Sequence, residues 1–206
     1  IIVKMEFKKI QLNGFKSFAE KTDLSIENGL TGIVGPNGCG KSNIVESLRW
    51  CMGETSAKSM RGSGMEDVIF SGTSNKPSKN IAEVTLNLIN DSLENVGQYS
   101  GIKNIEIKRK IEKDKGSKFS INGKEVRAKD AQMFFADLST GAHSPSLISQ
   151  GRIGSLVTAK PNDRRAILEE AAGISGLHAR RHEAEIRLNA AENNLKRADE
   201  LRRQQE

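Results

Sequence analysis

The sequence has 206 residues, of which 36% are hydrophobic and 28% charged, a balance typical of one globular domain with an appendage. The formal net charge of +6 is compatible with contact to an acidic polymer but does not require it. No apolar run approaches the roughly 18 residues of a membrane helix, and the polar start excludes a secretory signal. We therefore expect a cytoplasmic protein that does not contact a membrane. Cys39 and Cys51 lack the spacing of a metal or redox motif.

The first third of the chain predicts two strands, a third strand, a turn and a helix. Residues 7–12 and 24–26 alternate in places, as half-buried strands do. Residues 30–34 form an apolar run too short for a helix, and we expect a buried strand there. A glycine-rich segment follows, and apolar residues then recur at helical spacing from Ile44 to Met52.

The middle of the chain predicts antiparallel strands. Residues 81–89 and 104–111 alternate almost perfectly, and the polar residues 90–101 between them predict an exposed loop. Asn-Gly at 122–123 tolerates the positive φ angles of a type I′ turn, which predicts a hairpin over residues 118–127. A short helix is expected to follow, ending at residue 138.

The composition changes at Pro161, where Asn162 is a suitable helix N-cap. Beyond Gly176 the sequence contains no Pro or Gly. Positions 184, 188, 191, 195 and 198 have the 4-3-4-3 spacing of a coiled-coil seam, although a lone amphipathic helix packed on the domain is an alternative. We divide the chain into a cloning remnant or alternative start at 1–4, a globular lobe at 5–160 and a neck helix entering a coiled coil at 161–206.

Residues 35–42 match the motif G-x-x-x-x-G-K-[ST] between a predicted strand and a predicted helix. Gly38 and Gly40 let the backbone curl so that its N–H groups form an anion nest at a helix N-terminus. Lys41 is placed to reach the β- and γ-phosphates, and the Ser42 hydroxyl to bind Mg²⁺. A turn that merely joins strand to helix is the alternative. The expected ATP and Mg²⁺ site contains Gly35, Pro36, Asn37, Gly38, Cys39, Gly40, Lys41, Ser42 and Asn43.

Five segments resemble structural maintenance of chromosomes (SMC) proteins of the bacterial type. GPNGCGKSN, preceded by LNGFKSF at 12–18, resembles their N-terminus and that of related repair and recombination ATPases. Residues 60–72 resemble the segment that SMC heads carry after the first helix, and residues 148–151 resemble their glutamine loop. Residues 164–174 are similar to the stretch where the head passes into its coiled coil.

The resemblance implies roles for individual residues. Gln150 approaches Mg²⁺ and the γ-phosphate, and Arg61 lies near the nucleotide, so these two join Lys41 as catalytic candidates. A surface glutamine and an exposed loop arginine are the alternatives. The family's first loop brings Lys16 near the nucleotide. The residues expected to contact phosphate or to fix the turn are Asn37 and Asn43.

Two parts of an ABC-type ATPase are missing from the sequence. These are a Walker B carboxylate pair at the end of an apolar strand and a Leu-Ser-Gly-Gly signature. Residues 138–141 resemble the signature only superficially, because they precede Gln150 and Pro145 follows. In SMC proteins both parts come from the far C-terminus, which folds back along the coiled coil. The resemblance therefore implies an α/β P-loop fold, the N-terminal lobe of an ABC-type head with an antiparallel β portion, which is inactive by itself.

The resemblance also implies a function. The full-length protein would be an ATPase of chromosome condensation and segregation on the nucleoid, whose head engagement controls DNA entrapment. The implied partners are the C-terminal lobe of the same chain, a second SMC chain in a homodimer, a kleisin subunit and double-stranded DNA. The alternatives are a repair or recombination ATPase of the same superfamily, a self-contained P-loop phosphotransferase and a non-enzymatic assembly module.

For two further groups of residues, a functional interpretation competes with that of ordinary solvent-exposed residues. The basic residues of 103–115 could contact DNA phosphates, or they could protect a solvated sheet edge. His178 and His182 are spaced to share one helical face, but no third zinc ligand is evident. We expect both histidines to be solvated polar residues.

Overall fold

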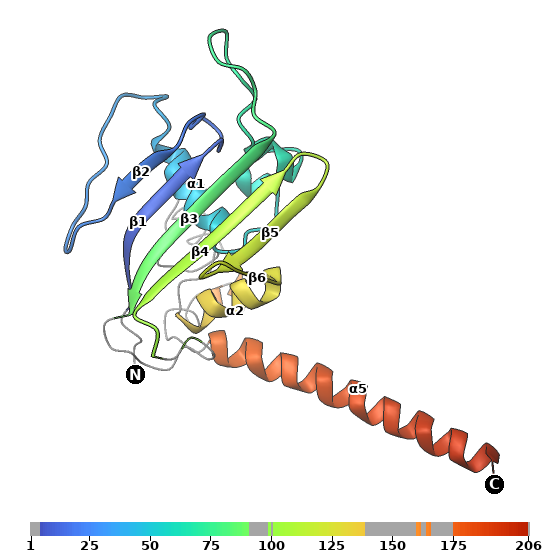
Figure 1. Cartoon of the computed structure of the whole chain (residues 1–206). Coiled ribbons are helices and arrows are strands. Elements are labelled where there is room, and N and C mark those ends of the chain that lie inside the picture. Colours follow the sequence, from blue (N-terminus) through green and yellow to red (C-terminus); the bar gives the residue numbers. More distant parts are fainter. Residues whose placement is uncertain are drawn as a thin grey trace.

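The structure is a computed structural model that describes residues 5–90, 99, 101–138, 160–161, 164–165 and 175–205. Six strands form one sheet in the order β2-β1-β3-β4-β5-β6, and every neighbouring pair is antiparallel (Figure 1). The strands are β1 Met5–Asn13, β2 Thr22–Ser25, β3 Ile81–Asn90, β4 Asn104–Glu112, β5 Gly116–Ile121 and β6 Lys124–Val126. The helices are α1 Lys41–Cys51, α2 Ala128–Asp137 and α5 Ser175–Gln205, with short 3₁₀ helices η1 Lys58–Met60 and η2 Met65–Val68.

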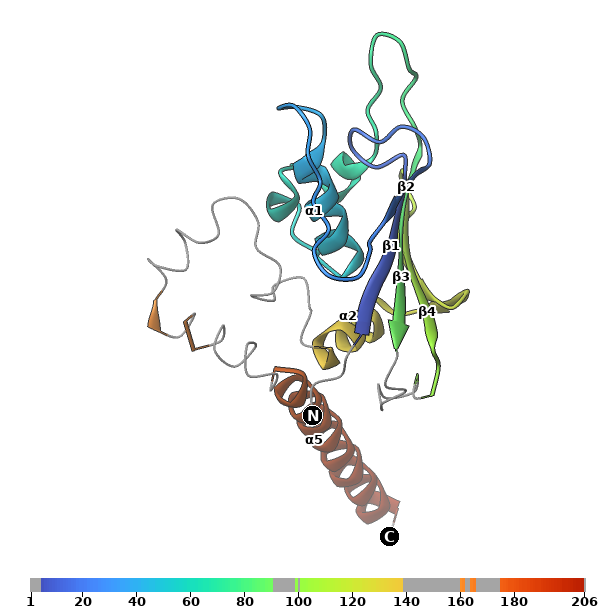
Figure 2. The ribbon, with the colours of Figure 1, turned by 90° about the vertical axis from the view of Figure 1, so that its left-hand side faces the viewer.

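The hydrophobic core lies between one face of the sheet and the two helices α1 and α2 (Figure 2). Buried and partly exposed residues alternate along the strands as the sequence predicts, because successive side chains of a strand point to opposite faces of the sheet. In β4, Ile105, Ile107 and Ile111 are buried in the core, whereas Lys108 and Lys110 are on the opposite face. Helix α1 contributes Ile44 and Trp50 to the same core, and α2 contributes two phenylalanines.

The hairpin between β5 and β6 confirms the turn predicted from Asn-Gly. Asn122 has a φ of 48° and Gly123 a φ of 78°, the positive values that a type I′ turn requires at both central residues. The register pairs Ile121 with Lys124 directly across this turn. The strands predicted at 81–89 and 104–111 and the helix predicted to end at residue 138 are likewise confirmed.

The strand expected at residues 30–34 is wrong for this chain. Residues 26–40 contain no strand or helix, and the side chains of Leu30 and Val34 are 99% and 94% exposed. An isolated extended segment has no hydrogen-bonding neighbour, and pairing is what makes a strand. No strand of the described sheet lies next to it, so the apolar run remains in solvent.

The expectation of a sheet edge at 103–115 is also wrong. Strand β4 pairs with β3 on one side and with β5 on the other, so it lies inside the sheet. The strands at the two edges are β2 and β6.

Helix α5 starts beside α2 and leaves the body of the protein as a single rod (Figure 1). Its seam residues Leu188 and Leu195 are 61% and 68% exposed. This exposure is expected of a coiled-coil helix without its partner helix. It contradicts the alternative of a helix packed along the domain. The division into a lobe and a neck stays a prediction. Asn162, most of the loop at 90–101 and the side chains of His178 and His182 lie outside the described residues.

Among the helices of the described residues, none combines the length and the apolar character needed to cross a membrane.

Candidate nucleotide-binding site

The glycine-rich loop runs into the N-terminus of α1, as the motif requires. Gly38 and Gly40 have φ angles of 82° and 97°, in the left-handed region that favours glycine. A Cβ on Gly40 would lie 2.5 Å from the Ser17 Oγ, so only glycine allows the loop to approach the preceding segment so closely. No side chain caps the first turn of α1 within the described part of the chain. The loop and the helix end therefore present main-chain N–H groups to solvent, as an anion nest does.

Lys41 folds back onto its own loop. Its Nζ donates hydrogen bonds to the carbonyl oxygens of Gly35 at 2.5 Å and Pro36 at 2.6 Å, and it lies 3.8 Å from the Cys39 Sγ. An ammonium group at this position suits the phosphates of a nucleotide, which would replace the carbonyls as its partners. Loop, helix end and lysine together fit a polyphosphate.

Ser42 follows in the first turn of α1 and is exposed. A hydroxyl there fits a Mg²⁺ ion, which takes few protein ligands and completes its shell with water and phosphate oxygens. Among the described residues, no three histidine, cysteine or acidic side chains gather into a metal site of their own.

Two further cations stand beside the loop, joined by a buried acid. Lys16 and Arg61 both form ion pairs with Glu46, which lies in the second turn of α1. Lys16 also donates to the carbonyl oxygen of Met60. The structure thus gathers Lys16, Arg61 and the loop, three groups far apart in the sequence, around one helix end.

Asn43 connects these cations to the first turn of the helix. Its Oδ1 accepts a hydrogen bond of 2.9 Å from the Arg61 Nη2, and its Nδ2 donates to the Ser17 Oγ at 2.9 Å. The expectation that Asn43 fixes the local geometry agrees with these contacts. Asn37 is exposed in the loop, and Gln150 lies outside the described residues.

The turn after Arg61 is held by Asp67. The Asp67 Oδ2 accepts hydrogen bonds from the main-chain N–H groups of Ser63 and Gly64 and from the Ser63 hydroxyl, at 2.6, 3.0 and 2.9 Å. The N–H of Gly64, then Ser63 and a nearby Lys16, keep the pKa of Asp67 below its ordinary value. Asp67 is therefore ionised near neutral pH and fixes the segment that carries Arg61.

Glu46 is the site residue that sequence reasoning missed. The available signal was a charged residue among Ile44, Ser47 and Trp50, the inward face of the helix. A buried acid on such a face needs cationic or hydrogen-bonding partners. The sequence does not say which of 32 lysines and arginines these are.

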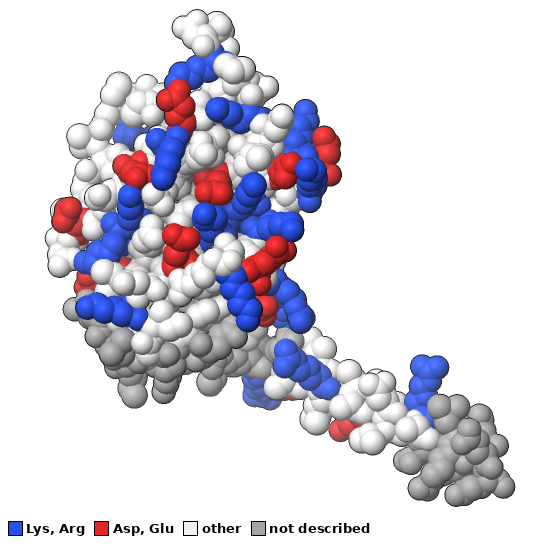
Figure 3. Space-filling model, in the orientation of Figure 1, with Lys and Arg blue, Asp and Glu red and all other residues white. Residues whose placement is uncertain are grey.

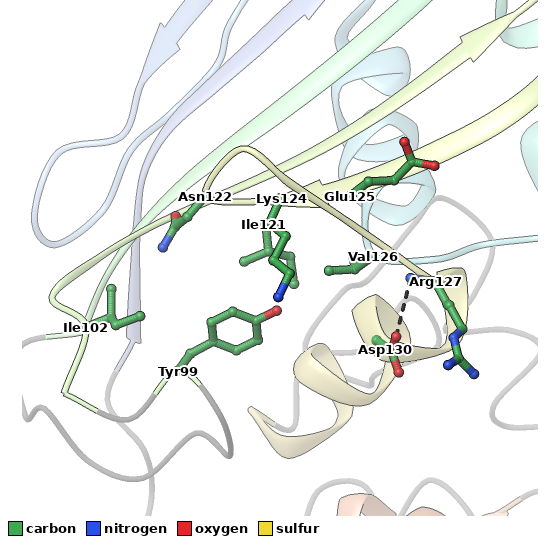
Figure 4. Close-up of a pocket in the computed structure, with 9 residues that line it drawn as sticks. All are labelled: Tyr99, Ile102, Ile121, Asn122, Lys124, Glu125, Val126, Arg127 and Asp130. Carbon is green, nitrogen blue, oxygen red and sulfur yellow. Dashed lines mark hydrogen bonds between the residues drawn. The ribbon is translucent and has the colours of Figure 1, made fainter.

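Two hollows lie outside the phosphate loop. One, of about 730 Å³, lies between the β5–β6 turn and α2, with Tyr99, Lys124 and Arg127 in its wall (Figure 4). There the main-chain N–H of Arg127 donates to Asp130 at the start of α2. The other, of about 660 Å³, contains Arg61. Neither of these two hollows is lined by residues 35–42.

The open face of the sheet carries lysines and acids in mixed order rather than one field of positive charge (Figure 3). Lys9 pairs with Asp23 at 2.6 Å, and Lys108 lies 3.5 Å from Glu83. Such paired, solvated charges agree better with a solvent-facing sheet surface than with a phosphate-binding stripe.

The family model of the RecF/RecN/SMC N terminal domain matches residues 6–152 of this sequence. That match extends over more than half of the 206 residues, and the chain belongs to this family of P-loop proteins.

Within the family, the chain is similar to the chromosome partition protein Smc of Cereibacter sphaeroides, with 59% identity over 198 residues. These residues make up 96% of this chain and 17% of that protein, so the chain spans about a sixth of its relative's length. The resemblance to bacterial SMC proteins inferred from the motifs is thereby confirmed.

Solved structures confirm the predicted fold. The Smc head domain of Pyrococcus furiosus, with an extended coiled coil and bound to the C-terminal domain of ScpA, is 30% identical. Its TM-score is 0.75 over 96% of this chain and 49% of that one. A structure described under ATP-driven dimerization and DNA-stimulated activation of SMC ATPases is 28% identical, with a TM-score of 0.68 over 80% of this chain and 98% of that one.

Proposed function

We propose that this chain is the nucleotide-binding N-terminal lobe of an SMC-type ATPase head. One observation carries the proposal: a glycine loop and a helix end form an anion nest, with Lys41, Lys16 and Arg61 gathered around it. ATP, bound together with Mg²⁺, would supply a phosphoanhydride bond whose hydrolysis releases free energy. Residues 35–42 hold its phosphates, Ser42 contributes a metal ligand, and Arg61 and Gln150 act near the γ-phosphate.

The test is nucleotide affinity in the full-length protein after Lys41→Ala. Loss of a charge-assisted phosphate contact should weaken ATP binding about 10- to 100-fold, which equilibrium titration with a fluorescent ATP analogue measures. Lys21→Ala is the matched control, since Lys21 is an exposed lysine just before β2. The ATP affinity of this variant should equal that of the unchanged protein. Equal ATP affinity in the two variants would contradict the proposal.

The sequence contains no convincing Walker B carboxylate pair or signature motif, and we infer that a second lobe supplies them. The exposed apolar residues 30–34 support this inference. They lie directly before the phosphate loop, and burial of a leucine and a valine side chain typically contributes about 1.5 to 3 kcal/mol each. A strand of the second lobe pairing with residues 30–34 would bury them and brace the loop. The second lobe would be the C-terminal part of the same full-length chain.

The wider function is inferred from the similar proteins named above. The full-length protein would be an ATPase of chromosome condensation and segregation, cytoplasmic and associated with the nucleoid. ATP-driven dimerization and DNA stimulation are described for a similar SMC ATPase, and ScpA binding for a similar head. We accordingly propose a second copy of the protein, a kleisin of the ScpA type and double-stranded DNA as partners.

A further inference from the structure

Glu46 is the sole acidic residue of α1, and its side chain is only 9% exposed. It lies one helical turn beyond Ser42, beneath the end of the helix that holds the phosphate loop. A carboxylate with so little access to water must be compensated by the protein, because an unpaired buried charge is strongly destabilising.

The two carboxylate oxygens have different partners. Oε2 pairs with the Lys16 Nζ, and Oε1 pairs with the Arg61 Nε. The Lys16 side chain is 13% exposed and is also held by a main-chain carbonyl, whereas the Arg61 side chain is 58% exposed. Lys16 is thus the fixed counter-ion of Glu46, and Arg61 is the one with room to move.

Both cations are carried by strained backbone. Lys16 has a φ of 47° and Arg61 a φ of 54°, values that residues with a side chain rarely adopt. Surrounding hydrogen bonds impose these angles: the Lys16 N–H donates to the Val68 carbonyl at 2.7 Å and the Arg61 N–H to the Lys58 carbonyl at 3.0 Å. Strain of this kind persists where the surrounding structure fixes the position of a side chain, and it is common at functional sites.

We propose that Glu46 is a positioning residue that keeps Arg61 beside the phosphate loop and yields it to a phosphate of the incoming nucleotide. This rests on the proposed function. A guanidinium binds carboxylate and phosphate with the same fork of donors, so Arg61 exchanges one anion for another. Lys16 stays on Glu46 during the exchange, so the buried carboxylate keeps a counter-ion. This explains why two cations share one acid.

The test compares ATP affinity of the full-length protein before and after Glu46→Gln, which keeps the shape and removes the charge. Arg61 then has no carboxylate to leave, and we expect the dissociation constant for ATP to fall about 10-fold. With Arg61→Ala already present, most of that gain should disappear, because the effect passes through Arg61. Glu46→Asp, which keeps the charge, should restore an affinity near that of the unchanged protein.

Glu20→Gln is the matched control, since Glu20 is an ion-paired glutamate whose side chain is 73% exposed and whose partner is Lys76. Unchanged or weaker binding in Glu46→Gln overturns the inference, and so does an equal gain with and without Arg61. Failure of the unchanged protein to bind ATP, or ATP affinity in Lys41→Ala equal to that of the unchanged protein, overturns the proposed function as well, so the two failures are distinguishable.

A stability measurement tests the division between the two cations without altering Glu46. Lys16→Met leaves the buried carboxylate with only a mobile partner, whereas Arg61→Met leaves it with the fixed one. We expect the unfolding temperature to fall at least about 2 °C further in Lys16→Met than in Arg61→Met. An equal or reversed order would contradict the claim that Lys16 is the permanent counter-ion.

Discussion

Arg109 lies on the inward face of β4, beneath the C-terminal end of α1, and is 3% exposed. Its guanidinium carbon is 4.5 Å from the centre of the Trp50 ring and 4.7 Å from that of Phe119. Nη1 donates to the carbonyl oxygens of Trp50 at 2.6 Å and Glu54 at 2.7 Å. Burial lowers the pKa of Arg109 to about 10, so the group is charged near neutral pH and satisfies carbonyls at the end of the helix.

Cys51 lies next to Arg109 and is also buried. Because a thiol is an acid, burial raises its pKa, whereas burial lowers the pKa of the basic Arg109. Burial raises the pKa of the Cys51 thiol to about 12, although Arg109 partly counteracts the shift. The Sγ is 3.6 Å from the carbonyl oxygen of Val84 and 3.7 Å from that of Ile107. The thiol is therefore protonated near neutral pH in the native protein.

We predict that the free energy of unfolding falls by about 1 kcal/mol between pH 8 and pH 10 through Cys51 alone. The native thiol, with a pKa of about 12, stays protonated over this range, while the unfolded thiol ionises near its ordinary value of 9.0. The native state thus binds the extra proton, and stability decreases as the pH rises. The lowered pKa of Arg109 acts in the opposite direction, and its effect begins as the pH approaches 10.

Urea unfolding of the chain at pH 8 and pH 10, beside Cys51→Ala, measures this effect. The variant should lose about 1 kcal/mol less stability than the unchanged chain over the interval, whatever its stability at pH 8. Parallel losses in both proteins would mean that Cys51 is not responsible.

At the scale of elements, α1 is fixed at both ends by residues distant in sequence. Its first turn is tied to Ser17 and Arg61 through Asn43, and its end to β4 through Arg109. The segment before the phosphate loop has no such support, because no backbone hydrogen bond joins residues 30–34 to a described strand. The rigid helix and the exposed segment therefore meet at the loop.

We predict that the backbone amides of residues 30–34 exchange with deuterium within seconds in this chain and become protected in the full-length protein. Protection requires hydrogen bonds, which a strand of the second lobe would provide. Hydrogen exchange followed by mass spectrometry compares the two samples, and the paired strand β5 serves as the internal control because it is protected in both. Fast exchange of residues 30–34 in the full-length protein would contradict strand pairing.

At the scale of the whole molecule, the chain presents two unsatisfied surfaces: the phosphate loop with residues 30–34, and the seam of α5. The two lie on different parts of the molecule, the loop beside α1 and the seam on the emerging rod (Figures 1 and 2). A C-terminal half that returns along the rod would cover both surfaces, since it would pair with the helix first and with the lobe afterwards.

We predict that this chain binds ATP but hydrolyses it at least about 100-fold more slowly than the full-length protein, because its sequence contains no convincing Walker B carboxylate pair to orient the attacking water. Phosphate release measured on equal molar amounts of both proteins, with Lys41→Ala as the background, decides the point. Comparable rates would favour a self-contained phosphotransferase.

The sequence by itself determined the local structure and the chemistry of the loop. Alternation predicted β3 and β4, Asn122-Gly123 predicted its hairpin, and residues 35–42 predicted the anion nest, because each depends on neighbours along the chain. The resemblance to SMC proteins supplied Lys16 and Arg61 as residues near the nucleotide.

Only the tertiary structure decided which distant residues meet. Glu46 as the shared partner of two cations and Arg109 as a buried cap both depend on long-range contacts that no local pattern encodes. The apolar run at residues 30–34 also shows that a local pattern cannot predict which distant residues meet. Its composition is that of a strand, but a strand exists only where a neighbour accepts its hydrogen bonds, and no described strand does so.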